Sequence, residues 1–305
     1  IMKQAGVVGV GDMGSGLAKN LIKAGIAVKG FDFLQKRMDA LVAMGGIAAN
    51  SASDAGKDSQ AVFVMVMNGD QAKEVIFGSQ DRQGLVATMQ PGAVILLTAT
   101  IHAREAREIA AQLSETGIHF VDSPVSGGFP GAQGGTLTMM AAGSDAALDI
   151  AKPAMEAVSG TIHRVGTEAG MGQTVKACLQ SLIGSFFSAT FEASALAAKA
   201  GVDAEAFLNV VSTSSAGCGI ANNALEQIID RKFEGTGSHI NTMYKDLTIS
   251  MDLARELGVP LFTAATAMQL FQAGKTKYPD GDNWVVTRIT EDIIGAGLSR
   301  AGKKS

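Results

Sequence analysis

Short apolar runs alternate with helical patterns throughout the first half of the chain, and this alternation restricts the fold more than any other feature. The runs lie at residues 6–10, 26–31, 61–67, 94–97 and 118–121, and each is followed by Gly, Asp, Asn or Thr. Between the first two runs, Met13, Leu17 and Leu21 recur every four residues and share one helical face, and Gly25 is a natural helix end. Repeated strand–helix–strand units predict a parallel, doubly wound sheet with helices on both faces.

The second half of the chain loses the strand pattern. Strand-like segments remain at 136–141 and 162–165, and from about residue 170 one helical face rich in Ala, Leu or Met follows another. Because 305 residues exceed the usual size of one hydrophobic core, we expect two domains. The first, over 1–164, is a Rossmann-type α/β domain. The second, over 165–305, is a long connecting helix followed by an all-α domain. The connecting helix has no charged residue from 177 to 191, and we expect it to be buried between domains or subunits.

Composition and charge exclude several classes of partner. Lys and Arg total 25 against 29 Asp and Glu, a net charge of -4, which gives no broad attraction for nucleic acid or an anionic membrane. Cys178 and Cys218 form no C-x-x-C pair and the four histidines are scattered, so we expect no disulfide, no metal site and a buried Cys178. The N-terminus leads straight into an apolar strand without the sections of an export signal, and a cytoplasmic protein is expected.

A glycine-rich segment follows the first predicted strand and opens the first helix. It consists of Gly9-Val10-Gly11-Asp12-Met13-Gly14. Gly9 permits a tight turn, Gly11 leaves room for a pyrophosphate against bare backbone, and Gly14 lets the helix pack closely on the sheet. The helix N-terminus directs amide hydrogens and a positive dipole end toward the phosphates. The segment predicts a dinucleotide site with Gly9, Gly11, Asp12, Met13 and Gly14 against the cofactor, although a glycine-rich turn without a ligand has the same pattern.

Asp32 supports the dinucleotide interpretation. It stands just after the second predicted strand, where a carboxylate accepts hydrogen bonds from the ribose hydroxyls of the adenosine and repels a 2'-phosphate. The expected cofactor is therefore NAD, with NADP the less favoured alternative. Lys36 and Arg37 follow closely, and we interpret them as the solvated start of a helix.

Three further segments decide the chemistry. They are Asp-Ser-Pro-Val-Ser-Gly-Gly at 122–128, Gly-Met-Gly-Gln-Thr-Val-Lys at 170–176 and Lys-Asp-Leu at 245–247. With the glycine-rich loop, they occur in the order typical of the β-hydroxyacid dehydrogenase family, and the chain resembles that family from residue 6 to about residue 294. The resemblance is to 3-hydroxyisobutyrate dehydrogenase-like proteins, and most closely to their threonate-oxidising branch. It implies a helical domain like that of 6-phosphogluconate dehydrogenase, and an active site in the cleft between the domains.

The resemblance also implies roles for individual residues. Lys176 would be the general acid and base, and its apolar neighbours in the sequence argue against an ordinary surface lysine. The substrate carboxylate would bind Ser126, Gly127 and Gly128, for which a plain glycine-rich turn is the alternative. Relatives carry Asn or His where this chain has Leu179, so Gln180 is the remaining polar substrate contact on that turn. Cofactor contacts are implied for Met67, Asn68, Thr100 and Lys245, although Lys245 with Asp246 also fits an exposed charged pair on a helix.

These features together predict an oxidoreductase acting on CH–OH groups. The expected reaction is NAD-dependent oxidation of a small hydroxy acid, threonate-like or 3-hydroxyisobutyrate-like, or reduction of the corresponding semialdehyde or keto acid. An imine reductase and a non-catalytic dinucleotide-binding module are the alternatives, and Lys176 argues against both. The family resemblance further implies a homodimer or homotetramer formed through the connecting helix.

Overall fold

The structure is a computed structural model that describes residues 2–302. The chain divides into two compact units, unit 1 (Ile1–Lys176) and unit 2 (Ala177–Ser305). The sequence places a boundary at residue 164, whereas the chain passes from one unit to the other inside the connecting helix α8 (Met171–Lys199). The difference arises because the first turn of α8 is hydrogen-bonded to the sheet of unit 1.

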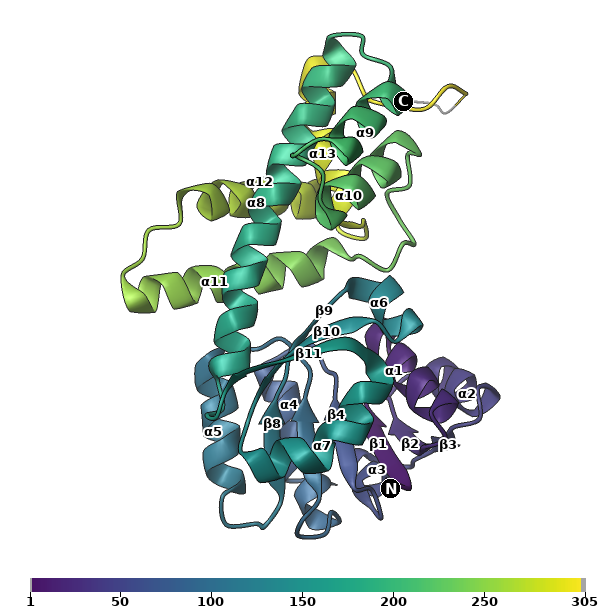
Figure 1. Cartoon of the computed structure of the whole chain (residues 1–305), viewed down its shortest axis with the longest axis vertical. Coiled ribbons are helices and arrows are strands. Elements are labelled where there is room, and N and C mark those ends of the chain that lie inside the picture. Colours follow the sequence, from purple (N-terminus) through teal and green to yellow (C-terminus); the bar gives the residue numbers. More distant parts are fainter. Residues whose placement is uncertain (1, 303–305) are drawn as a thin grey trace. The chain divides into compact units, whose positions relative to one another are not determined.

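Unit 1 has the predicted doubly wound α/β fold (Figure 1). Its main sheet has the order β11-β10-β8-β7-β4-β1-β2-β3, and β9 pairs with β10. The strands are β1 (Gln4–Val8), β2 (Ala27–Phe31), β3 (Ile47–Ala48), β4 (Ala61–Val64), β7 (Val94–Leu97), β8 (His119–Asp122), β9 (Val125–Ser126), β10 (Leu137–Ala142) and β11 (Ser159–Gly166). Pairing is parallel from β3 to β8, and β10 is antiparallel to β8 and β9. Because strand order reverses between β1 and β4, the loops that follow these two strands frame the usual ligand site of such sheets.

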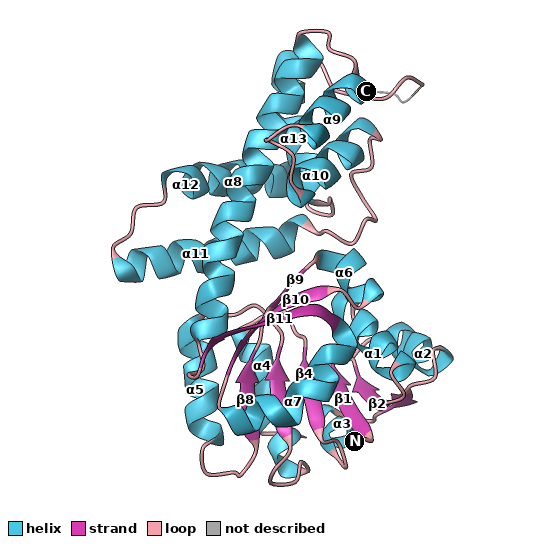
Figure 2. Ribbon diagram, viewed as in Figure 1, coloured by secondary structure: helices cyan, strands magenta, loops and turns pink. Residues whose placement is uncertain are grey.

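Alternate residues of the central strands pack into two separate cores. Val7 and Phe63 belong to the core shared with α1 and α7, whereas Val8 and Val64 belong to the core shared with α4 and α5. All four are at most 2 % exposed, because parallel strands carry helices on both faces (Figure 2). The helices of unit 1 are α1 (Asp12–Lys23), α2 (Gln35–Ala43), α3 (Ala52–Gly56), α4 (Gly69–Phe77), η1 (Leu85–Ala87), α5 (Ala103–Leu113), α6 (Gly128–Gly134) and α7 (Asp145–Val158).

The predicted strands differ from the observed ones mainly at their ends. β1 ends at Val8 and β4 at Val64, so the residues that follow each strand form the loops of the site. The sequence missed β3, β9 and the small hairpin of β5 (Gly78–Ser79) and β6 (Arg82–Gln83). Each is two residues long, which is too short for a period-2 pattern.

Unit 2 consists of helices within the described residues, together with one isolated bridge between His239 and Asp282. After α8 they are α9 (Ala204–Thr213), α10 (Gly219–Ile229), α11 (Ile240–Leu257), α12 (Phe262–Lys277), η2 (Asn283–Val286) and α13 (Thr287–Ile294). An aromatic cluster fills the core: Phe187 stacks on Phe191 at 5.8 Å between ring centroids, and Trp284 meets Phe187 edge-on at 5.6 Å. The all-helical character predicted for this part of the chain is confirmed.

Helix α8 has a buried side and an exposed side. Ala177, Phe187 and Phe191 are buried, whereas Cys178 lies off that face and is exposed. The prediction of a buried Cys178 is therefore wrong, because an apolar stretch of sequence does not show which side of a helix meets the core. Within residues 2–302, α8 is the one helix long and apolar enough to cross a membrane, a criterion that core helices also satisfy.

Candidate active site

The glycine-rich loop forms a turn that only glycine fits. Gly9 has a φ of +89°, and a Cβ on it would lie 2.1 Å from the carbonyl oxygen of Met65, just beyond β4. A Cβ on Gly14 would lie 1.8 Å from the oxygen of Gly9. The loop is thus pressed against both the end of β4 and the start of α1. Because Gly11 is the N-cap of α1, no N-cap side chain covers the first amides of that helix.

Asp32 is joined to this loop at the end of β2. Its Oδ2 accepts a hydrogen bond from the Val10 amide at 3.0 Å, and its Oδ1 accepts one from the Leu34 amide at 3.0 Å. Arg37 forms an ion pair with the same carboxylate at 3.2 Å, and its guanidinium carbon lies 3.4 Å from the place of a Cβ on Gly11. Arg37 is exposed in the first turn of α2 (Gln35–Ala43), as the sequence indicates, and it also pairs with Asp32. It adds a cation where the carboxylate was expected to act alone.

Two further loops leave the carboxyl ends of neighbouring strands. After β4, Met67 is exposed, and Asn68 caps α4 by accepting a hydrogen bond from the Gln71 amide at 2.9 Å. After β7, Thr100 lies in a loop whose first residues are held by the sheet, because the amides of Thr98 and Ala99 both donate to the oxygen of Val64 at 3.1 Å. Met67, Asn68 and Thr100 thus follow adjacent strands at the edge that carries the glycine-rich loop.

Ser126 ends β9, Gly127 is the N-cap of α6, and Gly128 is the first residue of that helix. Ser126 pairs with Thr138 of β10, and the two glycines have positive φ values of +129° and +58°, a backbone that other residues rarely adopt. Both glycines are exposed and Ser126 is half-buried. The segment is therefore an accessible turn with a backbone that depends on glycine.

Helix α6 packs this turn against α1, the helix that begins at the glycine-rich loop. A Cβ on Gly16 would lie 2.5 Å from the carbonyl carbon of Ala132, so the two helices pack backbone to backbone. The buried amide of Asn20 donates to the Ala132 oxygen at 2.8 Å, and the amide of Gln133 donates to the Asp12 oxygen at 3.2 Å. These contacts fix the turn at 126–128 relative to the glycine-rich loop. Sequence reasoning missed them because none of these residues breaks the helical pattern.

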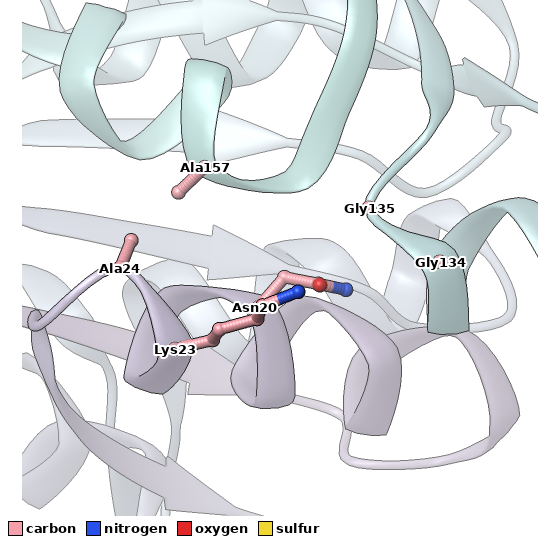
Figure 3. A pocket seen from close by; sticks show the side chains of 6 residues that line it. All are labelled: Asn20, Lys23, Ala24, Gly134, Gly135 and Ala157. Atoms are coloured by element: carbon pink, nitrogen blue, oxygen red, sulfur yellow. The ribbon is translucent and has the colours of Figure 1, made fainter.

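A surface hollow lies near the C-terminal end of α1 (Figure 3). It is lined by Asn20, Lys23, Ala24, Gly134, Gly135 and Ala157. None of these residues was predicted to bind substrate or cofactor, and Lys23 ends the helix whose first residues form the glycine-rich loop. The hollow is therefore separate from the predicted site.

The start of α8 is bound to the sheet by one buried carboxylate. Asp122, at the end of β8, accepts hydrogen bonds from the amide of Gly170 at 2.8 Å and from the amide and side chain of Gln173 at 3.2 and 2.8 Å. A Cβ on Gly172 would lie 2.6 Å from the Met140 oxygen, so glycine is needed for this close approach. Asp122 thus supplies the acceptor and the negative charge that favour a helix N-terminus.

The environment of Asp122 also affects its titration. The side chain is fully buried, and burial raises its pKa to about 6, although the hydrogen bonds from Gln173 and Gly170 oppose the rise. The carboxylate is therefore ionised at neutral pH and accepts the hydrogen bonds described above. The sequence motif contains Asp122, but no role was predicted for it.

Lys176 lies one turn after Gln173 on the same helix. The lysine is 6 % exposed and Gln173 is 1 % exposed. Long charged side chains are seldom buried to this extent without a specific interaction. Lys176 is therefore not the solvated surface lysine that its residue type alone would suggest.

In unit 2, Gln180 and Lys245 meet at Asp246. The Nε2 of Gln180 donates to Oδ2 of Asp246 at 2.7 Å, and the Nζ of Lys245 lies 3.1 Å from Oδ1. Asp246 is 5 % exposed, so the pair of Lys245 and Asp246 is not the exposed pair that the sequence also allowed. The Oε1 of Gln180 is buried without a hydrogen-bond partner. This oxygen is an available acceptor.

Comparison with known proteins identifies the family. Residues 4–166 match the NAD binding domain of 6-phosphogluconate dehydrogenase, and residues 170–289 match the family described as NAD-binding of NADP-dependent 3-hydroxyisobutyrate dehydrogenase. The chain is 35% identical to L-threonate dehydrogenase of Escherichia coli O6:H1 over 98% of its length and 97% of the relative's. It is 33% identical to NAD-dependent L-serine dehydrogenase of Pseudomonas aeruginosa, covering 96% of this chain and all of that one.

Solved structures agree with this relationship. The structure of 3-hydroxyisobutyrate dehydrogenase from Salmonella typhimurium has a TM-score of 0.87 and 32% identity, covering 94% of this chain and 99% of that one. An imine reductase from a Pseudomonas species has a TM-score of 0.63 at 18% identity, and this likeness shows a shared fold alone. The chain therefore belongs to the β-hydroxyacid dehydrogenase family of oxidoreductases, the family of 3-hydroxyisobutyrate dehydrogenase.

Proposed function

We propose that the protein oxidises a small hydroxy acid with NAD, or reduces the corresponding semialdehyde or keto acid, with Lys176 as general acid and base. The observation that carries this proposal is the burial of Lys176, at 6 % exposure, on a helix whose first turn is hydrogen-bonded to the end of β8. A buried amine held at the carboxyl edge of the sheet suits proton transfer at the edge where dinucleotides bind in this fold.

The residues of unit 1 fit a dinucleotide. Any Cβ on Gly9 or Gly14 would collide with backbone, so the loop keeps bare backbone at the N-terminus of α1, which suits a pyrophosphate. Asp32 would accept hydrogen bonds from the adenosine ribose. When bound, the nicotinamide accepts or supplies the hydride. Gly11, Asp12, Met13, Met67, Asn68 and Thr100 complete the proposed contacts in unit 1, and Lys245 the contact in unit 2.

We propose that the protein prefers NAD to NADP, because Asp32 is the anionic group at the end of β2. Its carboxylate would repel a 2'-phosphate. Arg37 weakens this argument, since its guanidinium partly neutralises the same carboxylate at 3.2 Å. The similar proteins differ in this respect, one being named for NAD and one matching family for NADP.

For the substrate, we propose a carboxylate that binds Ser126, Gly127 and Gly128. The accessible glycine backbone and the serine hydroxyl suit an anion without any arginine. Threonate-like acids come first, because a relative named for threonate is 35% identical over nearly the whole chain, and 3-hydroxyisobutyrate-like acids follow. Gln180 would accept a hydrogen bond from a substrate hydroxyl, since its Nε2 is held by Asp246 and its Oε1 is unpartnered.

In the proposed reaction, Lys176 moves one proton at the oxygen of the reacting carbon. In the oxidative direction the neutral amine takes the hydroxyl proton, and in the reductive direction the ammonium returns a proton to the carbonyl oxygen. Ser126 and the two glycines hold the carboxylate meanwhile, which restricts the substrate's orientation.

We further propose a cytoplasmic homodimer or homotetramer without a nucleic-acid or membrane partner. The net charge of -4 supports the absence of polyanionic partners. Exposed apolar side chains on α8, including Leu182, Phe186 and Leu196, support association between subunits through this helix.

The test is a screen of short hydroxy acids with NAD and NADP, using wild type, Lys176→Ala and the control Lys199→Ala. Lys199 lies on the same helix but is exposed. We expect Lys176→Ala to lower kcat by about 100-fold to 10,000-fold with little change in the Kd of NADH, and Lys199→Ala to retain activity. An unchanged rate in Lys176→Ala would refute the assigned role. NADH binding without turnover of any acid would instead favour a non-catalytic binding module.

A further inference from the structure

The side-chain amide of Gln173 has all of its polar atoms engaged inside unit 1. Its Oε1 accepts a hydrogen bond from the Ile101 amide at 3.0 Å, and its Nε2 donates to the Ala99 oxygen at 3.0 Å and to Asp122 at 2.8 Å. The orientation of the amide is fixed by chemistry. If nitrogen and oxygen were exchanged, two donors would face each other at Ile101, and two acceptors at both Ala99 and Asp122.

These contacts bracket Thr100. Gln173 pairs with the carbonyl before Thr100 and with the amide after it, as a neighbouring strand would. The loop is also held on its other sides, by the Val64 oxygen before Thr100 and by Glu105, which accepts from the His102 amide at 2.9 Å. Gln173 ties this loop to α8 through two backbone hydrogen bonds.

The same amide is three positions before Lys176. Residues at this spacing lie on one face of a helix, and the backbone of the first turn is fixed by Asp122. A shift of Gln173 would therefore move Lys176 relative to Thr100. A buried amide whose donors and acceptor are all paired fixes one local geometry in addition to contributing stability.

We propose that Gln173 is a positioning residue, which sets the place of Lys176 relative to the Thr100 loop by clamping the backbone on both sides of Thr100. This inference rests on the proposed roles of Lys176 and Thr100. Gln173 touches neither substrate nor cofactor in this proposal. Its effect should therefore appear in kcat rather than in cofactor affinity.

The experiment compares wild type with Gln173→Ala, with Gln173→Glu, and with a double variant that combines Gln173→Glu and Asp122→Asn. Gln173→Glu removes the donors and places a second carboxylate against Asp122. In the double variant the new amide at position 122 donates to the new carboxylate at position 173, and only the bond to Ala99 is lost. We expect kcat to fall by about 100-fold in both single Gln173 variants and to recover partly in the double variant, with the Kd of NADH little changed.

A second measurement is independent of turnover. The Ile101 amide donates to Gln173, so its hydrogen exchange should accelerate in Gln173→Ala if the clamp holds this loop. Val158→Ala is the control, because Val158 at the end of α7 is fully buried in the other core of unit 1, which contains neither Ala99 nor Ile101, so its truncation destabilises unit 1 without touching the clamp.

The outcomes separate the inference from the proposed function. Faster exchange at Ile101 with a specific loss of kcat supports the positioning role. Unchanged kcat in Gln173→Ala, or an equal loss of kcat in Val158→Ala, would overturn it. If wild type oxidises no hydroxy acid, the proposed function fails. The clamp is tested separately: an Ile101 exchange rate in Gln173→Ala equal to that of wild type would overturn it.

Discussion

The buried carboxylate of Asp122 should give unit 1 an unusual dependence of stability on pH. Its pKa is raised from 3.8 to about 6, chiefly by burial. Between these two values the folded state keeps a proton that the unfolded state has lost. The contribution of Asp122 to folding is therefore fully present below pH 3.8 and is lost as pH rises through about 6. A rise of this size corresponds to about 3 kcal/mol of unfolding free energy.

Asp122→Asn is the perturbation that isolates this effect. The variant carries no titrating group at 122, so the difference in unfolding free energy, wild type minus variant, should fall by about 2 kcal/mol as pH rises from about 4 to about 7. The comparison removes the titration of all other carboxylates, which both proteins share. Asp54→Asn is a control of opposite sign, because hydrogen bonding to Lys29 lowers the pKa of Asp54. The contribution of Asp54 is lost as pH falls.

The assay is urea denaturation followed by a probe for each unit. The only tryptophan, Trp284, lies in unit 2, so its fluorescence reports the unfolding of that unit. Asp122→Asn should leave the unfolding of unit 2 unchanged. Unit 1 is followed by amide hydrogen exchange in β7 and β8, including the Ser123 amide that donates to the Leu97 oxygen at 2.9 Å. A difference that stays constant or grows with rising pH would refute the reasoning.

Two other predictions concern the ligands. Asp32→Ala should weaken NAD binding by about 10-fold and NADP binding by less, whereas Arg37→Ala should weaken NADP binding and leave NAD binding unchanged. Both affinities are measured by direct titration. Equal weakening of NAD and NADP binding by each variant would contradict the assignment. Gln180→Leu should raise the KM of acids with a second hydroxyl by about 10-fold and leave the KM of acids without that hydroxyl unchanged, because the variant lacks the unpartnered acceptor Oε1. An equal rise in KM for all acids tested would argue against that contact.

The sequence predicted the residues that break a local pattern. Gly9 and Gly14 stand out because a turn and a close helix contact need glycine, and Lys176 stands out as a charge among apolar neighbours. Their surroundings in the structure agree with these expectations: any Cβ on the two glycines would collide with backbone, and the lysine is buried. The strand and helix periods likewise predicted the sheet and the all-helical unit, since long periodic elements carry the clearest signal.

The residues that hold the site together were not predictable in this way. Asn20, Gln173 and Asp246 are polar residues on helices, and such residues usually face solvent. Their burial depends on partners far along the chain: Ala132 lies 112 residues from Asn20, and Asp246 lies 66 residues from Gln180. No local pattern contains that information. The pairing of Arg37 with nearby Asp32 was not predicted either, because it depends on how the loop after β2 turns.

The contacts of Asp122 show why a buried polar residue lies near the proposed catalytic group, Lys176. The charge of Asp122 costs stability at neutral pH, yet it accepts the amides of Gly170 and Gln173 that begin α8. An apolar residue at 122 would leave those donors and the Gln173 amide without partners in a buried place. The unfavourable burial of one carboxylate therefore gives the start of α8 a defined position. In the proposed reaction Lys176 needs that position for proton transfer, because a displacement of about 1 Å at a reacting group lowers the rate by about 100-fold. A local cost in stability is expected where geometry decides the rate.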